Sequence, residues 1–371
     1  MKAIAVTPGT KKLTLLEIEE PKLKGATDVK IRMLDVGICG TDREICAFEY
    51  GTPPRGDQNL VIGHESLGRV VDLGAGVTKL KVGDLVVPMV RRPCPHDTCV
   101  ACRNGRQDFC YTGDFTERGI KEAHGFMTEV VVDDQEYMNP VPAALRDVAV
   151  LVEPLTIAEK ALMQIEQVQM RMPWAQGVSL RGSGRFKKRA VVLGAGPVGL
   201  LGAMAFANAG FETYVYSRSG GNADKPGIVA SFGAKYVPAE TTTFEELREM
   251  VGNIDVVYEA VGASKTAFDL LSVLGTNGVF VFTGVPGRKA PVEVDTDLLM
   301  RNLVLKNQVV FGTVNAGKET FAAAIKDLGA FVERWPGAVK SLITGRFPIE
   351  AHRDLLLARP TGIKNVLALA P

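Results

Sequence analysis

At the centre of the sequence stands Ala190-Val191-Val192-Leu193-Gly194-Ala195-Gly196-Pro197-Val198-Gly199, four apolar residues followed by glycines in the spacing Gly-x-Gly-x-x-Gly. This run continues into the apolar stretch 198–208. Together the two segments predict a strand, a tight turn and a helix. The start of such a helix directs free N–H groups and a positive dipole end at a pyrophosphate. A glycine-rich turn alone is also common as plain backbone geometry, but with its strand and helix it predicts dinucleotide binding. The predicted contacts are Gly194, Gly196, Pro197, Val198 and Gly199.

Short strand-like runs separated by helical stretches follow this turn along the chain. They lie at residues 213–216, 254–258, 278–282 and 308–311. Alternating strands and helices require a parallel sheet with crossover connections. The sequence therefore predicts an α/β fold with a Rossmann domain at residues 188–312.

The chain on either side of this domain has a different pattern of strand-forming, turn-forming and apolar residues. Four runs of strand-forming residues, each ended by turn residues, lie at 4–6, 29–33, 67–73 and 84–88. They predict a mostly antiparallel, barrel-like β domain over residues 1–187, with Gly182-Ser183-Gly184 as the nearest thing to a linker. Apolar residues recur near helical spacing at Phe321, Ile325, Leu328 and Phe331. We expect residues 313–371 to pack back onto the first domain.

The choice of dinucleotide depends on the end of the second Rossmann strand. An NAD-preferring fold places Asp or Glu there to bind the ribose hydroxyls, whereas this chain has Ser217, Arg218 and Ser219. A guanidinium and serine hydroxyls can bind a 2′-phosphate, so the sequence favours NADP. The alternatives are that Arg218 is only a solvated surface cation, or that the protein uses both NADP and NAD.

Four of the six cysteines lie close together, at Cys94, Cys99, Cys102 and Cys110. Four thiolates complete a tetrahedral shell and leave no open position, so this spacing predicts a structural zinc in a lobe at about residues 91–112. The alternative is reduced cysteines without a metal. His96 is a conceivable substitute ligand, but an exposed loop histidine is the better description.

A second set of residues predicts a zinc with an open position. Cys39 lies in a glycine-flanked turn after a strand, His64 precedes another strand, and Glu153 is an acid in an apolar stretch. Taken singly, Cys39 is more often a small buried hydrophobic residue, and His64 is more often a core histidine with its hydrogen bonds satisfied. A buried Glu153 is costly unless it is paired or bound to metal. Together the three could hold a catalytic zinc and leave a fourth position for an alcohol.

Composition limits the classes of function. The chain has 371 residues, 46% of them apolar and 23% charged, and a net charge of +1. These values suit a two-domain globular protein and give no electrostatic reason to expect nucleic acid or an anionic membrane as a partner. The N-terminal residues lack the features of a secretion signal, and the clustered cysteines favour metal over disulfides, so we expect a cytoplasmic location.

At this point the chain resembles a known family, the zinc-containing medium-chain alcohol dehydrogenases, over essentially its full length. Within that family it looks most like the archaeal-type glucose 1-dehydrogenases. The resemblance rests on these stretches: Gly37-Ile38-Cys39-Gly40-Thr41-Asp42-Arg43-Glu44, Gly63-His64-Glu65, Val90-Arg91-Arg92, Gly105-Arg106-Gln107-Asp108-Phe109-Cys110, Gly113-Asp114-Phe115 with Gly119-Ile120, His124-Gly125-Phe126-Met127 and Glu153-Pro154-Leu155.

The resemblance implies a GroES-like catalytic domain and roles for individual residues. Cys39, His64 and Glu153 would hold the catalytic zinc, and Glu65 would be the carboxylate beside it. Thr41 would relay the substrate proton, and Glu117 and Asn315 would face the sugar, with Thr41 and Glu153 also near it. The walls of the nicotinamide site would be formed by Phe282, Thr283, Val314 and Asn315.

Three positions depart from the family pattern. Glu44 stands where many alcohol dehydrogenases have the last histidine of the proton relay, so the sequence does not define the route by which the proton leaves. Val90 replaces a polar residue that contacts a sugar hydroxyl in some relatives, which leaves the preferred sugar open. The gap between Cys94 and Cys99 is wider than usual, so we expect a reshaped lobe.

The function that this sequence predicts is zinc-dependent oxidation of D-glucose, or another aldose such as galactose, at C1 with hydride transfer to NADP or NAD. The first alternative is a zinc-dependent polyol or L-threonine dehydrogenase. The second is an NADPH-binding regulatory protein without catalysis, because a fold does not fix a function. The expected partner is a small neutral sugar, and the resemblance suggests a homodimer or homotetramer joined near the strand at 308–311.

Overall fold

The computed structural model describes residues 1–175, 181, 188–219, 224–287 and 291–370. The chain forms two compact units. Unit 1 comprises Met1–Thr156, Asn315–Gly329 and Ile343–Pro371, and unit 2 comprises Ile157–Val314 and Ala330–Leu342. The predicted linker Gly182-Ser183-Gly184 lies outside the described residues, and so does residue 187 at the predicted domain boundary.

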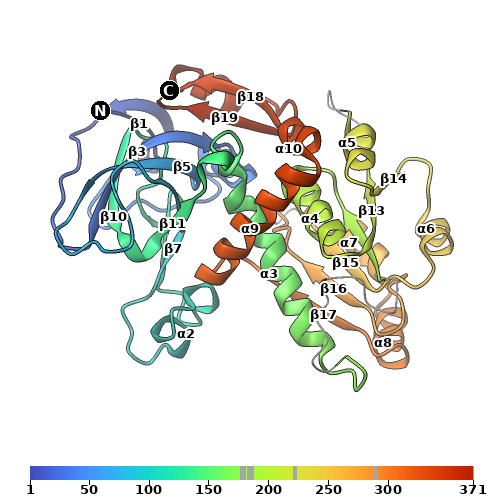
Figure 1. Cartoon of the computed structure of the whole chain (residues 1–371). Coiled ribbons are helices and arrows are strands. Elements are labelled where there is room, and N and C mark those ends of the chain that lie inside the picture. Colours follow the sequence, from blue (N-terminus) through green and yellow to red (C-terminus); the bar gives the residue numbers. More distant parts are fainter. Residues whose placement is uncertain (176–180, 182–187, 220–223, 288–290, 371) are drawn as a thin grey trace. The chain divides into compact units, whose positions relative to one another are not determined.

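Unit 1 is built mainly from β-strands, as the sequence predicted. Its largest sheet has the order β11-β6-β5-β3-β19-β18, with β10 also paired to β3; β2-β1-β4 and β7-β8-β9 form two smaller sheets (Figure 1). The strands are β1 (Lys2–Thr7), β2 (Lys12–Glu17), β3 (Asp28–Gly37), β4 (Leu60–Val61), β5 (Glu65–Leu73), β6 (Leu85–Pro88), β7 (Arg91–Arg92), β8 (Thr116–Arg118), β9 (Glu122–Ala123), β10 (Val130–Asp134), β11 (Met138–Val141), β18 (Ile343–Pro348) and β19 (Lys364–Ala368).

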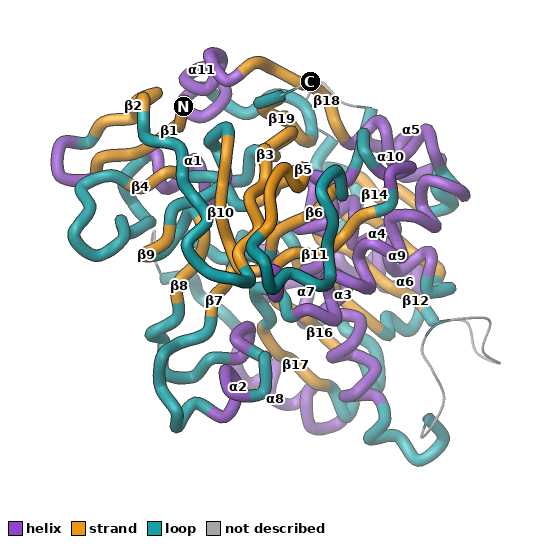
Figure 2. The backbone as a smooth tube through the Cα atoms, turned by 60° about the vertical axis from the view of Figure 1, so that its left-hand side comes forward, coloured by secondary structure: helices purple, strands orange, loops and turns teal. Residues whose placement is uncertain are grey.

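Strand β3 is central to this unit. It pairs antiparallel with β5, β10 and β19, and Ile31, Met33 and Val36 on it are fully buried. Figure 2 shows how strands predominate over helices around β3, β5 and β10. The helices that lie wholly within unit 1 are short: α1 (Gly40–Cys46), α2 (Val100–Arg103), α11 (His352–Leu357) and 3-10 turns at Pro8–Thr10, Gln107–Phe109, Gln135–Tyr137, Ala143–Leu145, Ala149–Leu151 and Ile349–Ala351.

Unit 2 contains the predicted parallel sheet. Its order is β14-β13-β12-β15-β16-β17, and every neighbouring pair is parallel. This order reverses between β13 and β15 around β12, the arrangement of a Rossmann fold, so the predicted fold class is confirmed. The strands are β12 (Arg189–Leu193), β13 (Glu212–Ser217), β14 (Lys235–Pro238), β15 (Val256–Glu259), β16 (Val279–Phe282) and β17 (Val309–Gly312).

Unit 2 has two kinds of helix: those that lie wholly within it, and those that begin in unit 1 and continue into it. Those within unit 2 are α4 (Pro197–Asn208), α5 (Lys225–Ser231), α6 (Phe244–Val251), α7 (Ser264–Leu271), α8 (Thr296–Leu305) and α10 (Pro336–Leu342). The helices α3 (Val152–Gln169) and α9 (Lys318–Arg334) each continue from unit 1 into unit 2. The last turn of α9 groups with unit 2 because Arg334 binds Asn208 at 2.6 Å and Trp335 packs on Phe232.

Candidate active site

Cys39, His64 and Glu65 converge at one end of the β3–β5 ladder. Cys39 lies between the end of β3 and the start of α1, and Glu65 begins β5 opposite Gly37. One potential ligand atom from each lies within 4.8 Å of the others. A Cβ at Gly37 would displace the Glu65 carboxylate, so glycine at this position leaves room for it. The site therefore combines a thiol, an imidazole and a carboxylate, which are donors that zinc accepts.

Asp42 orients the His64 ring. The carboxylate is fully buried in the first turn of α1; its Oδ2 accepts from the Cys39 N–H at 2.9 Å, and its Oδ1 lies 3.3 Å from His64 Nδ1. Burial lowers the pKa of His64, but Asp42 and Cys39 outweigh it and raise that pKa well above 6.5. With Nδ1 facing Asp42, Nε2 is the nitrogen left for a metal. Asp42 was not among the predicted site residues, although its place three residues after Cys39 could have indicated it.

Lys364 forms a buried ion pair with Glu65. Its Nζ contacts Glu65 Oε2 and donates to the Ile38 carbonyl oxygen at 3.2 Å. Burial lowers the pKa of Lys364, but the Glu65 carboxylate more than compensates and raises it above its usual value. Sequence reasoning missed Lys364, because only the pairing of β19 with β3 brings it beside Glu65.

Glu153 lies in the first turn of α3 and is buried. It is not one of the three residues whose ligand atoms lie within 4.8 Å of one another. Burial raises its pKa to about 7, against the opposing effect of His64, and the nearby Glu65 charge adds to the increase. Glu153 is thus a buried carboxyl group whose pKa is influenced by the charges of His64 and Glu65. A cation at this place would be favourable.

The two residues predicted to face the sugar contact each other. Asn315 Nδ2 donates to Glu117 Oε1 at 2.7 Å, and Glu117 lies on β8 with its side chain almost fully buried. Asn315 has a positive φ of 60°, a conformation that asparagine tolerates better than most residues. Thr41, the predicted proton relay, is half-buried in the first turn of α1.

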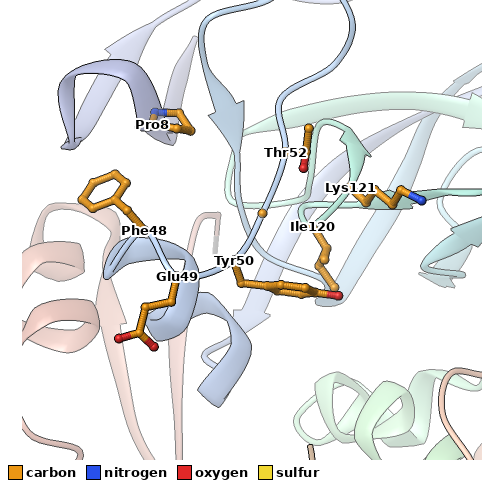
Figure 3. Close-up of a pocket in the computed structure, with 8 residues that line it drawn as sticks. Pro8, Phe48, Glu49, Tyr50, Thr52, Ile120 and Lys121 are labelled. Atoms are coloured by element: carbon orange, nitrogen blue, oxygen red, sulfur yellow. The ribbon is translucent and has the colours of Figure 1, made fainter. Parts of the chain in front are cut away.

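A cavity of about 420 Å³ lies beside Ile120 and Lys121, in the turn that follows β8 (Figure 3). Thr52 N–H donates to the Ile120 carbonyl oxygen at 2.9 Å, and Lys121 N–H donates to that of Glu117 at 2.9 Å. Burial raises the pKa of Tyr50, and the Glu117 charge raises it further. The cavity is lined by Pro8, Phe48, Glu49, Tyr50, Gly51, Thr52, Ile120 and Lys121.

The four lobe cysteines also converge. One sulfur from each of Cys94, Cys99, Cys102 and Cys110 lies within 4.8 Å of the others. Burial raises the pKa of Cys102 to about 12, whereas burial at Cys110 is outweighed by hydrogen bonds, first from Thr112, that lower its pKa to about 6. His96 is not part of the group; its half-exposed ring contacts Asp114 at 2.8 Å.

The glycine turn joins β12 to α4 as predicted. Gly194 has a φ of +106°, which only glycine adopts without strain, and a Cβ at Gly199 would collide with the Gly194 carbonyl oxygen. Gly196 is the N-cap of α4, and Pro197 is its first residue. Ala195 N–H donates to Ser217 Oγ at 3.2 Å, so the second strand stabilises the turn.

Arg218 is exposed after β13, next to a carboxylate that the sequence analysis missed. Glu240, two residues after β14, accepts from Ser219 N–H at 2.7 Å and from Ser219 Oγ at 3.2 Å. The Ser219 N–H is the main cause of the lowered pKa of Glu240, and the Arg218 charge contributes. The sequence offered little indication that Glu240 lies near Arg218, because the strand before it, β14, was not predicted.

The predicted nicotinamide wall is organised by Glu259 at the end of β15. Thr283 donates to the Glu259 carbonyl oxygen from its N–H at 3.1 Å and from its hydroxyl at 2.6 Å, just after Phe282. The Glu259 carboxylate accepts from the N–H groups of Val261 and Gly262, each at 2.7 Å. Farther along the chain, the Val314 carbonyl oxygen accepts from Lys160 Nζ at 2.9 Å.

Comparisons with known proteins agree with this arrangement. Family models match an alcohol dehydrogenase GroES-like domain at residues 25–143 and a glucose dehydrogenase C-terminus at residues 146–369. A glucose 1-dehydrogenase of Methanocella arvoryzae is 38% identical, over 100% of this chain and 99% of that protein. One of Thermoproteus tenax is 37% identical, over 99% of each. The structure of Haloferax mediterranei glucose dehydrogenase with NADP, Zn and gluconolactone matches with a TM-score of 0.88 and 32% identity over 100% of both chains.

The fold and site define an NAD(P)-dependent oxidoreductase of the alcohol dehydrogenase type. The chain belongs to the glucose 1-dehydrogenase family of the zinc-dependent medium-chain alcohol dehydrogenases. This confirms the resemblance seen in its motifs. No helix among the described residues is long and apolar enough to span a membrane.

Proposed function

We propose that this protein is a zinc-dependent glucose 1-dehydrogenase. It oxidises D-glucose, and related aldoses such as galactose, at C1 to the lactone and transfers the hydride to NADP or NAD. The observation that carries the proposal is the convergence of Cys39, His64 and Glu65 in the unit that also holds the Glu117–Asn315 pair. A relative crystallised with NADP, Zn and gluconolactone supports the substrate class.

The residues at this site fit a catalytic zinc. Cys39, His64 and Glu153 would hold it, and Glu65 would be the neighbouring carboxylate. His64 Nδ1 and Asp42 Oδ1 face each other and are buried without a well-formed hydrogen bond. A metal bound to Nε2 would hold the His64 ring in the orientation that faces Asp42. When bound, zinc polarises the C1 hydroxyl and makes it more acidic.

The chain's own residues bind the sugar and move its proton. Glu117 and Asn315 bind sugar hydroxyls and fix the orientation of C1. Thr41 passes the hydroxyl proton outward from its half-buried place on α1. Lys364 fixes the position of the Glu65 carboxylate through their buried ion pair.

The dinucleotide binds through unit 2. The Gly194–Gly199 turn and the N-terminus of α4 hold the pyrophosphate, while Ser217 and Arg218 hold the ribose and its 2′-phosphate. Phe282, Thr283 and Val314 of the same unit contact the nicotinamide. NADP supplies the hydride acceptor, and the protein supplies its orientation.

A second zinc is structural. Cys94, Cys99, Cys102 and Cys110 fit a closed four-sulfur shell, since their sulfurs already lie within 4.8 Å of one another. Such a site stabilises a loop and leaves no position for substrate. The wider first gap lets His96 turn away toward Asp114.

Cys39→Ser tests the catalytic site. It should abolish glucose oxidation, because zinc loses its thiolate, while NADPH binding measured by fluorescence titration stays normal. Cys46→Ser is the matched control: Cys46 is a buried thiol at the end of α1, and burial raises its pKa to about 12. We expect C46S to keep its turnover. Normal turnover in C39S, or equal loss in both variants, would contradict the assignment.

The substrate is tested by following NADPH formation with glucose, galactose, xylose, sorbitol and threonine, with and without a chelator. Chelator-sensitive turnover of aldoses supports the proposal. Turnover of only a polyol or threonine would keep the class of enzyme and reject the sugar. The absence of turnover with every substrate would favour a non-catalytic NADPH-binding protein.

We further infer a homodimer or homotetramer. Helix α8 has no buried residue, although four of its ten side chains, Leu298, Met300, Val304 and Leu305, are exposed and apolar. It leads into β17, which pairs only with β16 among the described strands. An apolar helix beside an open sheet edge suits an isologous contact with a second copy.

We also propose that the protein is located in the cytoplasm. All six cysteines are free thiols, and four of them form the lobe that would bind zinc. Thiolates bind zinc only while they are reduced, which suits a reducing compartment. Cell fractionation tests this placement.

A further inference from the structure

Arg91 is a buried guanidinium that contacts the four-cysteine lobe and Glu117 at the same time. Its Nε and one terminal nitrogen lie 3.1 and 3.0 Å from Glu117 Oε1. Its other terminal nitrogen donates to the carbonyl oxygens of Gln107 and Asp108 at 3.4 and 3.5 Å. The guanidinium also lies over the Phe115 ring, 3.7 Å from the centroid. A planar group held on several sides has one orientation, and it imposes one on the carboxylate that it binds.

The contact reaches both residues that would bind the sugar. The oxygen of Glu117 that accepts from Arg91 is also the one that accepts from Asn315 at 2.7 Å. The lobe meets the chain beyond Asn315 as well. There Arg106 pairs with Asp108 at 2.9 Å and with Glu319, in the first turn of α9, at 2.7 Å. The lobe therefore contacts Glu117 directly and also the segment that follows Asn315.

We propose that Arg91 is a positioning residue for Glu117, and that through Arg91 the four-cysteine lobe orients the Glu117–Asn315 pair. This inference rests on the proposed function, since it takes a sugar as the ligand of that pair. β7 places Arg91 directly opposite Glu117 on β8, so the contact is built into the strand pairing. The lobe then contributes to sugar binding in addition to stabilising the fold.

Arg91→Met tests the contact, because it keeps the side-chain length and removes every donor. We expect the KM for glucose to rise about 10- to 100-fold, as for loss of a charge-assisted hydrogen bond, while the KM for NADP stays unchanged. Arg91→Lys keeps the charge but cannot reach all three acceptors, so it should restore part of the affinity. A purely structural role would predict less active enzyme with an unchanged KM.

Arg92→Met is the matched control. Arg92 is the next residue on β7 and is largely enclosed. It pairs with Asp133 at 2.5 Å and lies over the Tyr137 ring at 4.0 Å. It does not contact Glu117. This variant should lower the thermal unfolding midpoint without raising the KM for glucose. An equal rise in KM for R91M and R92M would overturn the proposal.

Two further measurements separate the parts of the inference. Gluconolactone titrated calorimetrically into the NADP complex reports binding without turnover, and its affinity should fall in R91M. Arg106→Gln removes the ion pair between the lobe and Glu319. It should raise the KM for glucose by a smaller factor; an unchanged KM would reject the role of the lobe. Wild-type enzyme without glucose turnover contradicts the proposed function and the inference with it. Wild-type turnover with normal R91M contradicts the inference alone.

Discussion

The choice between NADP and NAD depends on one exposed residue, Arg218. Its guanidinium follows β13 with no carboxylate at that strand end, although Glu240 lies close by. Arg218→Ala should raise the KM for NADP about 10- to 100-fold, because a charged hydrogen bond to the 2′-phosphate is lost. The KM for NAD, which lacks that phosphate, should not change. Initial rates with each dinucleotide at saturating glucose measure both constants.

Arg248→Ala is the control for this prediction. Arg248 is an exposed arginine on α6 of the same unit, so the variant makes the same change in net charge. Both KM values should match the wild type. An unchanged KM for NADP in R218A would show that Arg218 is only a solvated cation.

Three strands of unit 1 are joined through a single carboxylate. Asp133 on β10 contacts Arg92 on β7 and Arg118 on β8, both at 2.5 Å. Burial raises the pKa of Asp133, but the two arginines outweigh it and hold the pKa below its usual value. A lowered folded-state pKa stabilises the fold above the unfolded pKa of about 4, and this contribution is lost as the pH falls through the folded value.

Asp133→Asn should therefore lower the free energy of unfolding of unit 1 by about 3 kcal/mol at neutral pH, because two buried guanidiniums lose their partner. The deficit should shrink as the pH is lowered through the acid range. Thermal unfolding at a series of pH values measures it. Glu212→Gln provides the contrast, since its ion pair with Lys235 is partly exposed to solvent and should contribute at most about 1 kcal/mol. A constant deficit at every pH would contradict the ion-pair account.

Local patterns predicted most of these elements but few of their partners. The strand, turn and helix at residues 190–208 were predictable because glycine spacing and apolar runs are local signals. β14 was missed, since its four residues Lys235–Pro238 are only partly buried and carry no apolar run. Lys364 and Arg91 were missed as partners because strand pairing, not local sequence, brings them to Glu65 and Glu117. The roles of Thr41, Glu117 and Asn315 toward substrate stay predictions.

At the scale of the whole molecule, the exposed apolar face of α8 predicts association. Met300 and Val304 are 64% and 70% exposed on a helix that buries none of its residues. The double variant Met300→Glu, Val304→Glu should shift the protein toward monomer, because it places like charges across a symmetric contact. Sedimentation velocity over a range of concentrations measures the shift. Glucose turnover per chain, measured alongside, shows whether assembly matters for activity.

Met250→Glu is the matched control for that variant. Met250 is 53% exposed on α6, in the same unit but away from β17. It should leave the sedimentation coefficient unchanged, since a single exposed methionine does not form an apolar patch with an open strand edge. If the α8 variant sedimented like the wild type, the contact would have to lie on another face. If the M250E variant also dissociated, the loss would reflect net charge and not the α8–β17 surface.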